Sequence, residues 1–149
     1  MGANGEEQGM TEGTRILVIE DDPDMRFILQ KVLEKIGYRV QAVESGLKGL
    51  EAIRGERFHL AIVNIKMPVM GGEETIREMR KIDPQIPVVV VTGSPEWLTE
   101  ELKAQIQGWI YKPFRLKELG SLVRDLLEAR KRSNCDHRIT DCATGEIKI

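Results

Sequence analysis

Five short apolar segments alternate with helix-period segments along this chain, and the alternation limits the folds it can adopt. The five segments are RILVIE (15–20), YRVQAV (38–43), FHLAIVNI (58–65), IPVVVVT (86–92) and WIY (109–111). The first contains a continuous apolar run, as is typical of a strand buried on both faces of a sheet. Strands separated by helices are joined by right-handed crossovers, so we predict a doubly wound parallel α/β sheet with helices on both faces.

Helix signals fill the segments between these runs. Asp22 followed by Pro23 is typical of a helix start, and Gly37 is a stop signal. Ser45 can cap a second helix, and residues 73–82 have the pattern of a third. We expect the second helix to bury three apolar side chains: Leu47, Leu50 and Ile53.

The last two helices differ in the strength of their apolar pattern. Ser94-Pro95 repeats the start signal, but the apolar stripe that follows is thin, so we expect this helix to be the least stable. The final helix, from Leu116 onward, is strongly amphipathic. The thin stripe consists of Leu98, Leu102 and Ile106.

Size and charge favour one cytoplasmic domain. A chain of 149 residues suits a single core, and a net charge of −2 favours neither nucleic acid nor membrane as a partner. No apolar run is long enough to span a bilayer, and no secretory signal is visible. We expect residues 1–13 to be a disordered leader and residues 132–149 to be a small hairpin or a disordered tail. The spacing of Cys135 and Cys142 matches no common zinc pattern.

Polar side chains follow four of the predicted strands. Glu20 and Asp21 follow the first, Asn64 ends the third, Thr92 ends the fourth and Lys112 follows the fifth. The carboxyl ends of parallel strands share one edge, so these groups should converge there. The oxygen ligands suit Mg²⁺, while the hydroxyl and the ammonium could hold a phosphoryl group.

The segments that carry these residues resemble signature stretches of the receiver domains of two-component response regulators. They are ILVIEDDPDMR, IVNIKMPVMGG, VVVVTGS and YKPF, in the family's order and at its spacing. The resemblance covers residues 14–131 and implies a flavodoxin-like (βα)5 fold with strand order 2-1-3-4-5. It implies a phosphorylation-dependent signalling switch and not an enzyme.

Residue by residue, the resemblance also implies roles for the polar groups at the strand ends. Glu20 and Asp21 resemble the acidic pair that binds Mg²⁺, with the Lys66 backbone carbonyl as a further ligand, and Asn64 stands at the phosphoacceptor position beside that metal. Thr92 resembles the switch hydroxyl, and Lys112 resembles the lysine that pairs with the phosphoryl group. Trp109 resembles the aromatic switch. Tryptophan is larger than the usual ring at its position, which argues against inward rotation.

The departure with the largest consequence is Asn64, because the family has an aspartate there. Acyl-phosphate formation needs a carboxylate oxygen, and an amide oxygen is a poor nucleophile. We therefore expect the chain as written to be phosphorylation-inert, with Mg²⁺ binding weakened or absent and Lys112 bridging directly to the acidic pair or to the Asn64 carbonyl. Two origins fit this sequence: a natural receiver that signals without phosphorylation, or an engineered replacement of an acceptor aspartate.

Two enzyme or carrier classes use similar sheets. A metal-dependent phosphatase of the haloacid dehalogenase type needs an Asp-x-Asp pair after the first strand, and Asp22-Pro23-Asp24 has that spacing. Pro23 should start a helix there and turn Asp24 away. A flavin carrier needs a glycine- and hydroxyl-rich phosphate loop after the first strand, which this chain lacks.

Partners follow from the resemblance and from the length of the chain. The resemblance implies a sensor histidine kinase or a phosphotransfer protein as phosphoryl donor. Residues 132–149 are too few for a DNA-binding helix-turn-helix unit, so we expect no direct nucleic-acid contact. We expect a downstream protein partner, and weak self-association, on the face formed by the helix after Ser94, the strand at 109–111 and the helix from Leu116.

Overall fold

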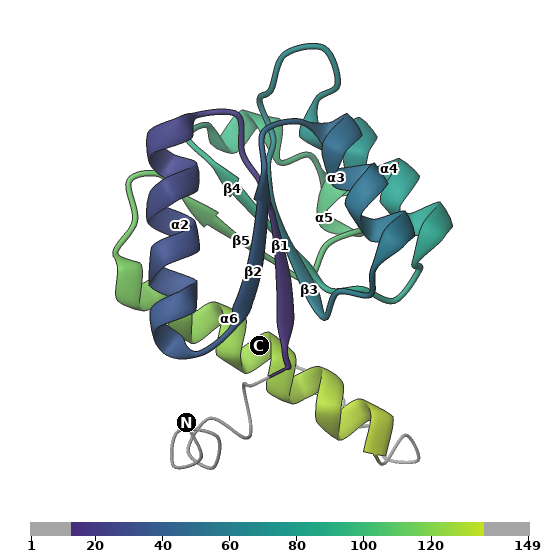
Figure 1. Ribbon diagram of the computed structural model, residues 1–149. Coiled ribbons are helices and arrows are strands. Elements are labelled where there is room, and N and C mark those ends of the chain that lie inside the picture. The colour runs from purple at the N-terminus through teal and green to yellow at the C-terminus, as the bar shows by residue number, and fades with distance from the viewer. Residues whose placement is uncertain (1–12, 136–149) are drawn as a thin grey trace.

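The computed structural model describes residues 13–135 and shows one five-stranded parallel sheet with strand order β2-β1-β3-β4-β5 (Figure 1). Each strand is four or five residues long, and β1, β3 and β4 are almost entirely buried. The strands are β1 (Arg15–Ile19), β2 (Arg39–Val43), β3 (Leu60–Asn64), β4 (Val88–Thr92) and β5 (Gly108–Tyr111). The predicted doubly wound sheet and its 2-1-3-4-5 order are confirmed.

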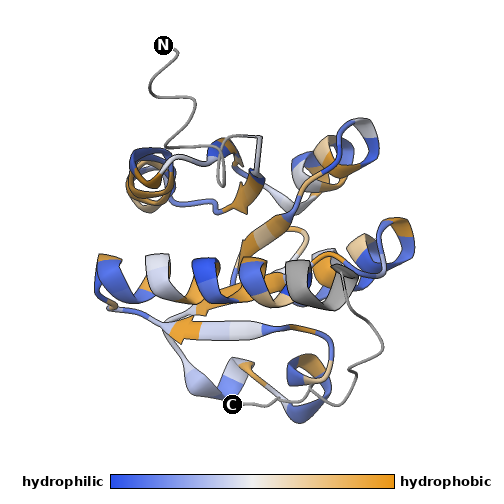
Figure 2. Cartoon of the chain, turned by 90° about the horizontal axis from the view of Figure 1, so that it is seen from below, coloured by the Kyte–Doolittle hydropathy of each residue, from blue (hydrophilic) through white to orange (hydrophobic). Residues whose placement is uncertain are grey.

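Helices cover both faces of the sheet. They are α2 (Pro23–Ile36), α3 (Gly46–Gly55), α4 (Gly72–Ile82), α5 (Glu100–Lys103) and α6 (Leu116–Cys135). Helices α2 and α6 lie on one face, and α3, α4 and α5 lie on the other (Figure 1). Figure 2 shows the apolar strands between these layers and the polar outer surfaces of the helices.

The core is split into two apolar clusters by the pleat of the strands. Successive side chains of a strand point to opposite faces. Leu17 and Ile19 of β1 therefore pack toward the α3–α5 layer, while Ile16 and Val18 pack toward α2 and α6. All four side chains are fully buried, which explains why the run is continuously apolar.

The predicted ends of α2 and the predicted start of α3 are confirmed, although the Asp22 side chain makes no capping hydrogen bond. Helix α2 begins at Pro23 after Asp22, and Gly37 ends it with a φ of 122°, a conformation that favours glycine. At the start of α3, the Ser45 hydroxyl accepts a hydrogen bond from the backbone N–H of Lys48 at 3.2 Å. Two expectations for the helical segments are nevertheless wrong.

The helix expected after Ser94 does not form as one element. Pro95–Trp97 makes a single 3₁₀ turn, and the four-residue α5 then starts at a separate cap, where the Thr99 hydroxyl accepts from the Leu102 N–H at 3.1 Å. The three stripe residues are still buried. Burial of a thin stripe is thus achieved by two short turns, because so few apolar contacts do not require a continuous helix.

The second wrong expectation concerns Leu47. Its side chain is 55% exposed, whereas Leu50 and Ile53 are buried as predicted. Leu47 lies in the first turn of α3, beside Gly46 and Gly49, which are the residues that face the core there. Glycine at those positions lets α3 approach Thr75 and Ile19 closely, so the helix turns its glycine side inward.

Arg80 of α4 stabilises the irregular chain around α5. Its guanidinium group donates to the carbonyl oxygen of Gln105 at 2.8 Å, to that of Ile86 at 2.6 Å and to the Gln107 side chain at 2.9 Å. The Gln107 side chain in turn accepts from the N–H of Val88 at 2.8 Å. One arginine therefore ties the chain before β4 to the chain before β5.

Helix α6 continues to Cys135, four residues beyond the expected domain end at 131. The expected leader is, apart from Gly13, outside the described residues, and so is the proposed hairpin of the tail beyond Cys135. Within residues 13–135, no helix combines the length and apolar character needed to cross a bilayer.

Gly72 places the start of α4 directly against the end of β3. Its N–H donates to the Ile65 carbonyl at 2.8 Å, and a methyl group at this position would collide with the backbone of Asn64 and Ile65. Backbone atoms cannot move aside as a side chain can. The glycine therefore sets the distance between α4 and the functional edge.

We predict that Gly72→Ala destabilises the protein by about 1–3 kcal/mol, because the added methyl overpacks against the backbone. Gly55→Ala is the matched control: Gly55 also lies in a helix, and its added methyl would meet open space. The control should be neutral or slightly stabilising. Urea denaturation of both variants checks this, and equal effects would contradict the close-approach argument.

Candidate functional site

The carboxyl ends of four strands bring the predicted polar residues to one rim. Glu20 and Asp21 follow β1, Asn64 ends β3, Thr92 ends β4 and Lys112 follows β5. Glu20, Asn64 and Thr92 are among the few buried polar side chains in the described part of the chain, with exposures of 1%, 6% and 2%. Side chains that are polar and buried together at a strand edge form a site and not a solvated surface.

The amide of Asn64 is the centre of this site. Its nitrogen donates to Glu20 Oε2 at 3.0 Å, to Asp21 Oδ1 at 2.9 Å and to the Lys66 carbonyl oxygen at 3.2 Å. Three acceptors surround one NH2 group, so its two N–H bonds are shared among them. The structure thus gathers the acidic pair, residue 64 and the Lys66 carbonyl, as the sequence predicts.

Burial raises the pKa of the Glu20 carboxyl, with the Asp22 N–H and the Lys112 ammonium acting in the opposite direction. Glu20 Oε2 accepts from the Asp22 N–H at 3.2 Å. Among the buried side-chain atoms of the described residues, Glu20 Oε1 has no hydrogen-bond partner. The carboxylate is therefore only partly compensated for its loss of water.

Lys112 forms an ion pair with that second oxygen. Its Nζ lies 3.5 Å from Glu20 Oε1, a separation and orientation that give charge attraction without a hydrogen bond. The lysine side chain is 28% exposed, so solvent still reaches the ammonium. Its backbone N–H donates to the Thr92 carbonyl at 2.8 Å, which fixes the lysine beside β4.

The two predicted switch residues, Thr92 and Trp109, form no hydrogen bond with Asn64 in this structure. The Thr92 hydroxyl donates to the Ser94 carbonyl at 3.3 Å and accepts from the Ser94 N–H at 3.2 Å. Trp109 is 37% exposed, and the Lys103 ammonium lies 5.0 Å from the centre of its ring. Cation–π attraction of this kind holds the indole on the outer face.

Arg26 is a site residue that the sequence analysis missed. Its guanidinium donates to the carbonyl oxygens of Glu20 at 2.9 Å and of Asp21 at 3.4 Å, which holds the backbone of the acidic pair from helix α2. The available signal was an arginine in the first turn of the helix after an acidic pair. Asp24, the second acid of the phosphatase spacing, is exposed in that same turn.

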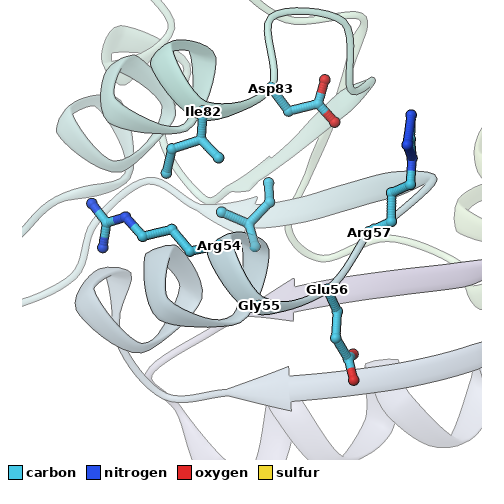
Figure 3. A pocket seen from close by; sticks show the side chains of 7 residues that line it. Arg54, Gly55, Glu56, Arg57, Ile82 and Asp83 are labelled. Atoms are coloured by element: carbon cyan, nitrogen blue, oxygen red, sulfur yellow. The ribbon is translucent and has the colours of Figure 1, made fainter.

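A second concave region lies far from this rim and carries no site. It is an open depression of about 410 Å³ at the carboxyl ends of α3 and α4, lined by Ile53, Arg54, Gly55, Glu56, Arg57, Ile82 and Asp83 (Figure 3). In this view the side chains of Arg54 and Arg57 point away on opposite sides. In a parallel fold these helix ends lie at the amino ends of the strands, opposite to Asn64.

The raised pKa of Glu20 should make stability depend on pH, and Lys112 should reduce that dependence. A carboxyl whose pKa is raised in the folded state binds its proton more tightly there, so stability falls as pH rises from 4.5 through the raised value. The positive charge of Lys112 reduces this loss of folding stability, because it attracts the ionised Glu20 carboxylate. Lys112→Met should be close to wild type near pH 4, where Glu20 is protonated, and less stable by about 1 kcal/mol near pH 7.

Denaturant unfolding in EDTA at several pH values measures this difference. Lys117→Met is the matched control, because Lys117 is exposed in α6 and has no ion pair among the described residues. It should show no such pH trend. A constant deficit for Lys112→Met across the range would contradict the ion-pair account.

Comparisons with known proteins agree with this geometry. A family model described as "Response regulator receiver domain" matches residues 16–124. The response regulator receiver protein CpdR of Brucella abortus is 37% identical over 117 residues, which are 77% of this chain and 98% of CpdR. The transcriptional regulatory protein ZraR of Klebsiella oxytoca is 36% identical over 118 residues, which are 78% of this chain but only 27% of ZraR.

Solved structures give the same result. A CheY-like receiver domain from Methanospirillum hungatei matches with a TM-score of 0.75 and 30% identity, over 80% of this chain and 97% of that one. The response regulator TrrA of Thermotoga maritima, solved in complex with Mg(2+)-BeF, matches with a TM-score of 0.72 and 27% identity, over 76% of this chain and 98% of TrrA. The flavodoxin-like order of strands and the matching family model agree: this chain belongs to the response regulator receiver domains.

Proposed function

We propose that this receiver domain is phosphorylation-inert as written, because Asn64 stands at the phosphoacceptor position. The observation that supports the assignment is the set of three hydrogen bonds from its amide to Glu20, Asp21 and the Lys66 carbonyl. These contacts put residue 64 at the centre of the acidic rim. We assign the receiver domain to residues 14–131 and place the protein in the cytoplasm.

The chemistry of the side chain explains the loss of activity. Attack on phosphorus needs an anionic oxygen, whereas the Asn64 oxygen is neutral and its nitrogen is occupied as a donor. Asp21, the nearest acid, contributes its Oδ1 to the Asn64 amide, and Glu20 is held by Asp22 and Lys112. In-line displacement requires tight placement, so these acids are poor substitutes.

Mg²⁺ binds weakly or not at all in this proposal. Receiver domains typically bind this ion, and TrrA was solved with it. Here the rim supplies two carboxylates, an amide and one backbone carbonyl, and no three acidic, histidine or cysteine side chains of residues 13–135 form a metal cluster. Loss of one carboxylate removes an attraction of about 4 kcal/mol for each pair of unit charges at about 4 Å and an effective dielectric near 20, before desolvation is counted.

Restoring the carboxylate tests the proposal. Asn64→Asp should gain phosphate on residue 64 from acetyl phosphate with Mg²⁺, and should bind beryllofluoride, while the wild-type chain does neither. Intact mass and peptide mapping give the readout. Phosphate on residue 64 of the wild type would overturn the proposal, and failure of both forms would show that the rest of the pocket is incompetent.

The partner surface in this proposal is the face formed by α5, β5 and α6. Receiver domains interact with histidine kinases or phosphotransfer proteins, and in this proposal one of these is the partner on the side of the phosphoryl donor. ZraR is described as a transcriptional regulatory protein and MtrA as a DNA-binding response regulator, and for this chain the proposed target is a downstream protein. Trp109 and Tyr111 of β5 are exposed on that face.

Weak self-association should use the same face. Sedimentation velocity over a wide concentration range should show a reversible dimer for wild type and a monomer for Trp109→Ala, because the indole is the largest exposed apolar group on β5. Phe27→Ala is the control: Phe27 is also exposed, but it lies on α2. A wild type that stays monomeric at every concentration would contradict the proposal.

A further inference from the structure

We propose that the Asn64 amide is an intramolecular substitute for the divalent cation of this site. The inference rests on the proposed function, since it takes residue 64 to stand at the phosphoacceptor position. It goes further, because it assigns the NH2 group a function of its own: the group holds the rim in one arrangement and excludes the cation. Removing the amide should therefore strengthen cation binding.

The geometry of the amide supplies the first step. One nitrogen lies 3.0 Å from Glu20 Oε2, 2.9 Å from Asp21 Oδ1 and 3.2 Å from the Lys66 carbonyl oxygen. These oxygens come from β1 and from the loop after β3, and they converge on a single point. An oxygen facing three acceptors would be repelled, so the NH2 end of the amide must be the one that faces them.

The charges supply the second step. Glu20 and Asp21 are neighbouring carboxylates that repel each other, and the buried Glu20 has also lost water, which is costly without compensation. The NH2 group gives each carboxylate a donor, Lys112 adds a positive charge 3.5 Å from Glu20, and Arg26 binds the two backbone carbonyls. Together these groups perform the neutralising role that a bound ion has at such a site.

As arranged, these residues do not fit a divalent cation. The position that a cation would share with Glu20, Asp21 and the Lys66 carbonyl is the one that the amide hydrogens occupy. A cation there would face the positive end of the amide dipole. It could be admitted only if the amide rotated and gave up all three hydrogen bonds, two of them to charged acceptors.

The same contacts fix the loop between β3 and α4. Asn64 binds the carbonyl of Lys66 two residues later, and Gly72 binds the Ile65 carbonyl, so the loop is held at both ends without a metal. Within it, Val69 adopts a φ of 67°, which is strained for a β-branched residue. The side chain of Lys66 lies 5.9 Å from the ring centre of Trp97 on the neighbouring loop.

The test compares Mg²⁺ binding by the wild type and by Asn64→Ala, using titration calorimetry with the full chain. If the amide substitutes for the cation, alanine frees three oxygens and Mg²⁺ binds about tenfold more tightly than to the wild type. If the amide oxygen is a metal ligand instead, alanine weakens binding. Equal or weaker binding by Asn64→Ala overturns the proposal.

A second variant and a second measurement cover a failure of the alanine variant to fold. Asn64→Ser keeps a small polar group and should also bind Mg²⁺ more tightly than the wild type. In wild-type NMR spectra, the Asn64 side-chain NH2 signals should be protected from solvent exchange and unmoved by Mg²⁺. Signals that exchange rapidly, or that shift as Mg²⁺ is added, count against the proposal.

Controls separate this proposal from the proposed function. Gln41→Glu makes the same amide-to-acid change at an exposed position on β2 and should leave Mg²⁺ binding unchanged. Acetyl-phosphate labelling of Asn64→Asp tests the phosphoacceptor assignment alone. Labelling of that variant together with weaker Mg²⁺ binding by Asn64→Ala would keep the proposed function and reject the cation substitute.

Discussion

The burial of the Glu20 carboxylate beside Asp21, at the edge of an apolar parallel sheet, is the constraint on which the functional end of this protein depends. Strand β1 is continuously apolar from Ile16 to Ile19, and Glu20 follows directly after it with 1% exposure. Water cannot solvate such a group, so the protein itself must supply donors and positive charge. Asn64, Lys112 and the Asp22 N–H do so from three different segments. The fold is what brings those segments together, and the charges at the rim are what make their arrangement specific.

The sequence predicts the scaffold well because one physical pattern dominates it. Strands buried on both faces, such as β3 and β4, accept almost only apolar residues, and the local signals at Pro23, Gly37 and Ser45 mark helix boundaries independently of distant contacts. The convergence of polar residues at the strand ends is also predictable, since it follows from parallel topology. Hydrogen-bond partners are not. The Asn64 amide presents its nitrogen to the acids, and Thr92 pairs with Ser94. Both choices depend on atomic displacements of less than about one ångström, which the spacing of residues along the sequence does not encode.

The errors in the prediction share a cause. The spacing of Leu47 alone predicts that it is buried. Gly46 and Gly49 beside it let α3 approach the core more closely than a leucine would, so the glycine side of α3 faces inward and Leu47 is exposed. The helix expected after Ser94 is broken between Trp97 and Glu100, and a long-range donor holds the chain after α5. Arg80 of α4 donates there to the Gln105 carbonyl, and an arginine on a helix gives no sequence signal of the carbonyls that it will reach. Local patterns describe a segment well only where its neighbours add no competing contact.

The position of α4 links the two ends of the molecule that matter most. Its first residue rests on the backbone of Asn64, and its Arg80 grips the chain at Gln105, three residues before β5 begins. One helix therefore contacts the acidic rim through its first residue and, through Arg80, the chain that leads into the strand carrying Trp109.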